Sequence, residues 1–176
     1  MAAFLLIVVA VLSRVVPHPA WLNFTAVGGA LLYFGARRPL RQMWIPLLAL
    51  MVTDYYLTVF FYGYPFHISA YLVTWLWEAG VIVLGMILLA RRTSVARVVA
   101  GALLAPTSFF VISNFACWVG MPQLYPRSLA GLEMSYLAGL PFYRNDLLST
   151  TIVAGLAFGM PAAVHMLAQR HQPASV

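Results

Sequence analysis

This 176-residue sequence has only four acidic side chains, and two of them lie inside long apolar runs. Asp54 and Glu78 are surrounded by aliphatic and aromatic residues, and Asp146 begins the last apolar run. An acid placed in hydrocarbon is costly, so such residues usually mark a functional site. The alternative is that Asp54 and Glu78 join helices, either neutral or paired with an arginine such as Arg14. Both interpretations stay open at the level of sequence.

Amide and aromatic side chains occur in the same stretches as the acids and suit the binding of a small molecule. A mixture of carboxylates, amides and rings is typical of a ligand pocket. For any single ring the alternative is a membrane-interface belt, and for Asn145 and Asp146 it is a helix cap. The candidate binding residues are Asn23, Asp54, Glu78, Asn114, Trp118, Tyr125, Glu133, Tyr136, Asn145 and Asp146.

Motifs for catalysis, metal binding and covalent cofactors are not found in the sequence. It contains no HExxH, GxSxG or Walker loop, and without lysine it cannot form a Schiff base with retinal or pyridoxal phosphate. His67 and His165 are far apart in the sequence, so a shared metal or haem is not expected. The single cysteine, Cys117, is kept only as a minor candidate ligand. We therefore expect no enzyme, no metal and no cofactor.

The composition indicates that most of the surface faces lipid. Hydrophobic residues make up 63% of the chain and charged residues only 8%, whereas a soluble domain has roughly a quarter of its residues charged. The net charge of +6 comes from arginines scattered between apolar runs, which argues against a nucleic-acid partner. The expected partners are membrane lipid and a small-molecule substrate.

Charges and clusters of proline or glycine divide the apolar sequence into six segments. We therefore predict an all-α integral membrane protein with six transmembrane helices in a single domain that covers residues 1–176. The first two segments, separated by Pro17 and Pro19, are short for a full span of about 20 residues. The predicted segments are residues 2–16, 22–36, 42–61, 67–90, 95–118 and 147–167.

The arginines predict the orientation of these helices, because short cytoplasmic loops are enriched in them. With six spans, Arg14, Arg127 and Arg144 fall on one side and the other seven arginines on the opposite side. We therefore expect a multi-pass protein of the bacterial inner membrane with both termini in the cytoplasm.

Residues 120–145 differ from the rest because proline and glycine interrupt them repeatedly. They are expected to form an outer lid that includes a short helix ended by Pro141. This lid would close over an outward-facing pocket built from the second, third, fifth and sixth segments.

Several strings of residues carry a family resemblance, including Asn23-Phe24-Thr25-Ala26-Val27-Gly28-Gly29-Ala30, Ser113-Asn114-Phe115 and Leu140-Pro141-Phe142. They resemble the DUF6580 family of small bacterial membrane proteins, which are described as transport proteins. That family is similar to the substrate-binding S components of energy-coupling factor (ECF) transporters, which are six-helix proteins that take up vitamins or metal ions. The resemblance implies an S-component-like bundle that acts either with an ECF-type energising module or alone.

The leading functional hypothesis is a substrate-binding membrane transport protein for uptake of a small molecule, such as a vitamin-like compound or a metal complex. The alternative is a structural or assembly subunit of a larger membrane complex, in which the polar layer meets a partner protein. A closed cavity favours the first hypothesis, whereas a flat exposed face favours the second.

Overall fold

The computed structural model describes residues 1–16 and 23–170, and in that part of the chain it contains six α-helices and no strand. The all-α prediction is confirmed, while the break predicted at Pro17 and Pro19 lies outside the described residues. A short 3-10 helix, η1, precedes the third α-helix, and a π-helical segment, η2, continues it. The elements are α1 (Ala2–Val15), α2 (Val27–Arg37), η1 (Leu40–Gln42), α3 (Trp44–Tyr56), η2 (Leu57–Phe61), α4 (Ile68–Leu89), α5 (Val95–Gly120) and α6 (Leu129–Arg170).

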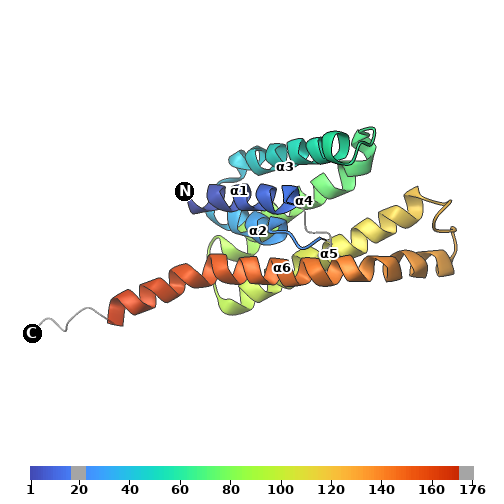
Figure 1. Cartoon of the computed structure of the whole chain (residues 1–176). Coiled ribbons are helices and arrows are strands. Elements are labelled where there is room, and N and C mark those ends of the chain that lie inside the picture. The colour runs from blue at the N-terminus through green and yellow to red at the C-terminus, as the bar shows by residue number, and fades with distance from the viewer. Residues whose placement is uncertain (17–22, 171–176) are drawn as a thin grey trace, which may run out of the picture.

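Successive helices run back and forth along one axis (Figure 1). The helices α2 and α4 end at the same end of the bundle at which α1 begins and α6 ends. Arg37, the last residue of α2, donates from Nη2 to Thr93 Oγ1 beyond the end of α4, at 3.4 Å. The two arginine-rich connections therefore share one end of the molecule, as the sequence predicts.

Three helical stretches in the described part of the chain are long and apolar enough to cross a membrane: Leu40–Phe61, Ile68–Leu89 and Val95–Gly120. The prediction of six spans is therefore corrected. With 14 and 11 residues, α1 and α2 are too short, because a rise of 1.5 Å per residue gives only about 21 and 17 Å against a hydrocarbon thickness of about 30 Å.

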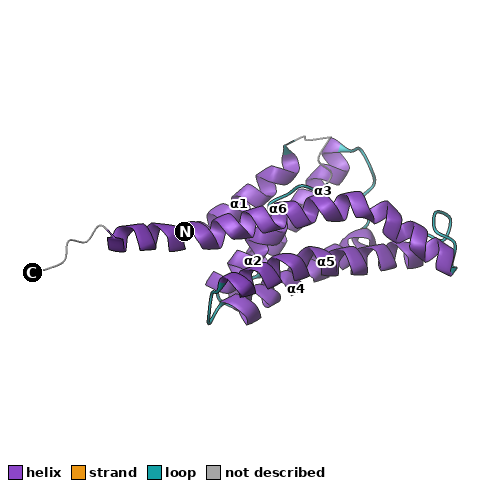
Figure 2. Cartoon of the chain, turned by 90° about the horizontal axis from the view of Figure 1, so that it is seen from below, coloured by secondary structure: helices purple, strands orange, loops and turns teal. Residues whose placement is uncertain are grey.

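The short helix α2 is the core of the bundle. Residues 27–36 are all buried, and α1, α4, α5 and α6 pack around them (Figure 2). A Cβ atom at Gly28 would lie 2.3 Å from Thr150 Oγ1, and one at Gly29 would lie 2.7 Å from Val153 Cβ. These two glycines therefore allow α6 to lie directly against the first turn of α2.

The last helix differs most from the sequence-based prediction. It begins at Leu129 and runs for 42 residues, with Pro141 and Pro161 inside it, so the prediction that Pro141 ends a short lid helix is wrong. Proline is tolerated inside membrane-protein helices because neighbouring groups satisfy the freed backbone carbonyls. Within the predicted lid, residues 120–145, only the connection at residues 121–128 is non-helical. The helices α5 and α6 therefore form a long hairpin (Figure 1).

Candidate functional site

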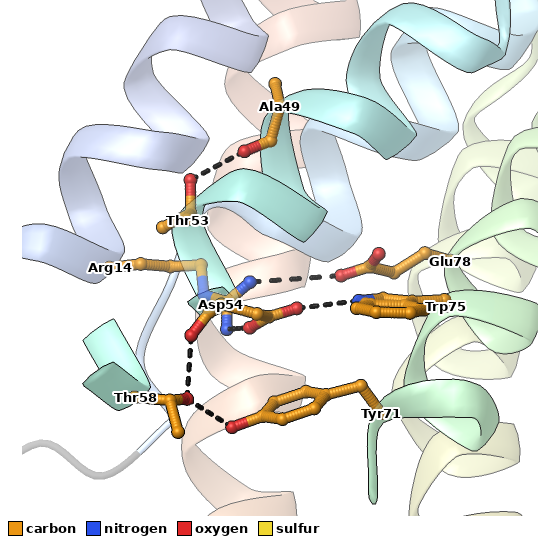
Figure 3. A network of polar contacts seen from close by, with 8 residues as sticks. All are labelled: Arg14, Ala49, Thr53, Asp54, Thr58, Tyr71, Trp75 and Glu78. Atoms are coloured by element: carbon orange, nitrogen blue, oxygen red, sulfur yellow. Dashed lines mark hydrogen bonds and ion pairs between the residues drawn. The ribbon is translucent and has the colours of Figure 1, made fainter. Parts of the chain in front are cut away.

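A cluster of charged side chains lies where α1, α3 and α4 meet (Figure 3). Arg14 Nη2 donates to Asp54 Oδ1, and Arg14 Nη1 lies 4.0 Å from Glu78 Oε1. The indole nitrogen of Trp75 donates to the other carboxylate oxygen of Asp54, at 2.8 Å. Both acids are almost completely buried, with 2% exposure for Asp54 and 1% for Glu78. Asp54 is thus held by donors on both oxygens, whereas Arg14 lies between two acids.

The backbone around Asp54 departs from regular α-helix. The π-helical segment η2 follows α3 directly, and π-helical turns are frequent at functional sites. Thr58, in this segment, donates its hydroxyl to the carbonyl oxygen of Asp54 at 2.7 Å, and the same hydroxyl is bonded to the Tyr71 hydroxyl on α4. The hydroxyl of Thr58 in η2 therefore connects α3 to α4 next to the charged cluster.

The start of α2 is joined to the end of α1 next to this cluster. Ser13 Oγ accepts a hydrogen bond from the backbone N–H of Ala26 at 3.0 Å, and it donates to the carbonyl oxygen of Ala10 at 2.7 Å. Asn23, just before α2, has a φ of 58°, in the left-handed region that asparagine tolerates better than most residues. These contacts place Arg14 and Asn23 beside the same space.

That space is a cavity of about 220 Å³. It contains one cationic and three acidic side chains together with three aromatic rings, and the lining comes from α1, the start of α2 and α3 to α6. The sequence-based prediction was one pocket built from the second, third, fifth and sixth segments, whereas α1 and α4 also line this cavity. The lining residues are Arg14, Asn23, Thr25, Val27, Asp54, Tyr71, Thr74, Trp77, Glu78, Phe109 and Asp146.

Glu78 is the least satisfied polar residue of the cavity. Its Oε2 atom is buried and has no hydrogen-bond partner within the described residues. A buried polar atom without a partner is costly and uncommon in native proteins. Glu78 itself lines the cavity, so its carboxyl group is next to the space that a bound molecule would occupy.

A smaller cavity of about 120 Å³ lies next to the first, between α5 and α6. Asn23, Phe109 and Asp146 line both cavities, and Asn114 lines the smaller one. Asp146 is 7% exposed and accepts a hydrogen bond from Thr150 Oγ1 at 3.2 Å. Of the predicted binding residues, Asn23, Asp54, Glu78, Asn114 and Asp146 are therefore brought together.

The other predicted binding residues lie elsewhere and line neither cavity: Trp118, Tyr125, Glu133, Tyr136 and Asn145. The indole of Trp118 donates to the carbonyl oxygen of Pro126 at 3.0 Å. The hydroxyl of Tyr136 donates to the carbonyl oxygen of Val111 at 3.0 Å, and Glu133 is exposed. Trp118 and Tyr136 thus hold the hairpin of α5 and α6 together.

Arg14 and Trp75 belong to the site but are not among the predicted binding residues. Arg14 is separated from Asp54 by 40 positions, and no spacing rule links them. The sequence did contain one signal, because it placed Arg14 at the outer end of its segment, in the layer that holds Asp54.

Residues 1–174 match the model of a family of unknown function, DUF6580. The chain belongs to this family. The match confirms the DUF6580 resemblance, but a family of unknown function assigns no activity to its members. Comparison of this DUF6580 member with curated protein sequences and with solved structures gives no match. The function is therefore argued from the cavity.

Proposed function

We propose that this protein is a membrane transport protein that mediates the uptake of a small molecule. It binds this molecule in the larger cavity, which residues from all six α-helices line. The observation that carries the proposal is a cavity of about 220 Å³ lined by Arg14, Asp54, Glu78 and Asp146 in a chain of which only 8% of the residues are charged. Charged groups at this depth are expensive and are retained mainly along substrate or ion pathways.

The unpartnered oxygen of Glu78 supports ligand binding over a purely structural role. An acid that only joined helices would have both oxygens satisfied, as Asp54 has through Arg14 and Trp75. Glu78 has one oxygen 4.0 Å from Arg14 and the other without a partner in the described chain. A ligand that supplies the missing donor would offset the desolvation cost.

The proposed role is binding and not catalysis. Among the described residues, those that line the larger cavity include no histidine, cysteine or serine, so they do not offer a substrate the usual pairing of a nucleophile with a base. The acids act as hydrogen-bond acceptors and as fixed charge.

The proposed location is the bacterial inner membrane, with the arginine-rich end of the bundle in the cytoplasm. Both arginine-rich connections lie at that end, and cytoplasmic loops are enriched in arginine. The cavity lies toward the opposite end, where α1 and α3 end and α4 begins, so it would load from outside. The energy source implied by the family resemblance is an ECF-type module, and its co-purification from the native host would test that partnership.

The experiment is native mass spectrometry of the protein purified from its native host in mild detergent. We expect a small-molecule adduct on the wild type and on Glu133→Gln, and none on Glu78→Gln. Glu133→Gln is a matched control, since it makes the same chemical change at an exposed position outside both cavities. The absence of an adduct, together with a stoichiometric protein partner, would instead identify an assembly subunit.

A further inference from the structure

Acidic side chains outnumber basic ones around the larger cavity. Its lining contains the guanidinium of Arg14 and the carboxyl groups of Asp54, Glu78 and Asp146. Arg14 is committed to Asp54 by a direct hydrogen bond, so it leaves little positive potential for a bound anion. Glu78 lines the cavity, and its Oε2 atom is buried without a hydrogen-bond partner among the described residues. Such a site attracts a ligand that brings positive charge and N–H donors.

The walls of the cavity specify the rest of the ligand. Trp77 and Phe109 lie against each other, with ring centroids 4.6 Å apart, and both line the cavity together with Tyr71. Aromatic faces bind organic cations and flat rings, and tryptophan does so best. A volume of about 220 Å³ lies below the usual range of about 300–1,000 Å³ for sites that bind drug-sized molecules. The ligand must therefore be small.

An inorganic metal ion does not fit these residues. Among the described residues no group of three or more histidine, cysteine, aspartate or glutamate side chains is close enough to hold a metal. A small organic cation needs no such group, because it spreads its charge and places its body against the rings.

We infer that the cavity binds a small organic cation with a flat or aromatic body, whose nitrogen donors are accepted by the carboxyl group of Glu78. This inference rests on the proposed function and names the substrate class of the same site. Asp54 keeps its role as the partner of Arg14, and Asp146 adds negative potential at the side of the cavity shared with the smaller one.

The test uses three probes of nearly identical shape that differ in charge: benzamidine is a cation, benzamide is neutral and benzoate is an anion. Binding to the full-length protein in lipid nanodiscs is measured by isothermal titration calorimetry, with empty nanodiscs subtracted. We expect benzamidine to bind about tenfold or more tightly than benzamide, and benzoate to bind most weakly, because a hydrogen bond to a charged group contributes at least this factor.

Glu78→Gln should raise the dissociation constant for benzamidine to that for benzamide, while Glu133→Gln should leave it unchanged. The comparison of probes on the wild type needs no variant, so it decides the inference even where Glu78→Gln fails to fold. Equal affinity for the three probes, preference for benzoate, or no binding of benzamidine at millimolar concentration would overturn it. A neutral compound found on the native protein would also overturn it and yet leave the proposed function standing.

Discussion

Gly35 of α2 and Gly85 of α4 occupy equivalent positions in the packing of two parallel helices. A Cβ atom at Gly35 would lie 1.9 Å from the carbonyl oxygen of Ile82, and one at Gly85 would lie 2.2 Å from the carbonyl oxygen of Leu32. Gly35 therefore lies against the α4 backbone about one turn before Gly85, and Gly85 lies against the α2 backbone about one turn before Gly35. Close backbone approach through small residues is a common way to join helices in membranes, and here it fixes α4, which carries Glu78, against the core helix.

This packing predicts that Gly35→Ala and Gly85→Ala each lower the free energy of unfolding by about 1–3 kcal/mol, since the added methyl group must push two backbones apart. Thermal unfolding of the detergent-solubilised protein, followed by tryptophan fluorescence, measures the effect. Gly80→Ala, on the same helix, is the control, because a Cβ there has no neighbour within 4 Å. Equal midpoints for Gly85→Ala and Gly80→Ala would contradict the close packing of α2 and α4.

The buried pair of Arg14 and Asp54 predicts a strong coupling between these residues. Asp54→Asn should cost about 1–3 kcal/mol of stability, because it leaves the Arg14 guanidinium without its charged partner. Arg14→Met should cost a similar amount by isolating the carboxylate. The double variant should cost less than the sum by about 1 kcal/mol or more, as expected for residues in direct contact. Additive effects in equilibrium unfolding would show that the pair contributes nothing to stability.

Helices with uninterrupted apolar sequence could be predicted closely from the sequence. Residues 67–90 were expected and α4 covers Ile68–Leu89, while residues 95–118 were expected and α5 covers Val95–Gly120. Prolines and glycines misled the prediction for α6, because Pro141 usually ends a helix in water but is accommodated here by packing. The shortness of α1 and α2 was visible in the sequence, but the burial of α2 among the other helices was not.

The acids of the site could be predicted from the sequence, but their partners could not. Asp54 and Glu78 were identified because a carboxylate in an apolar run is rare and costly. The pairing of Asp54 with Arg14 and Trp75 depends on how α1, α3 and α4 pack, and the sequence offered Arg14 only as one arginine in the same layer. Trp118 and Tyr136 were assigned to the pocket by residue type, although their polar atoms bond to backbone carbonyls in the hairpin of α5 and α6.

The unpartnered oxygen of Glu78 predicts that this residue does not stabilise the ligand-free protein. Glu78→Met removes a buried polar group and keeps most of the side-chain volume. The free energy of unfolding without ligand should therefore stay the same or rise by up to about 1 kcal/mol. The measurement is thermal unfolding in detergent after extensive washing, with Glu133→Met as the exposed control. A loss of more than about 1 kcal/mol would show that Glu78 serves mainly to hold Arg14.

The continuous helix α6 predicts that the first part of this helix is ordered before any ligand binds. Residues 129–145 are helical, and side-chain hydrogen bonds tie them to α5. Ser135 Oγ donates to the carbonyl oxygen of Asn114 at 2.8 Å, and Tyr136 donates to that of Val111 at 3.0 Å. Gly131 also lies against the connection, because a Cβ there would be 1.8 Å from the carbonyl oxygen of Pro126.

Hydrogen exchange measured by mass spectrometry in nanodiscs tests this order. Amides of residues 129–145 should exchange slowly without ligand, as those of α4 do, while residues 121–128 should exchange quickly. Tyr136→Phe should raise exchange in the first part of α6 by an amount that corresponds to about 1 kcal/mol, the usual contribution of one hydrogen bond. Rapid exchange throughout residues 129–145 that becomes slow at saturating benzamidine would instead mean that this part of the hairpin closes over the cavity as a lid, because only an ordering transition on binding changes protection in that way.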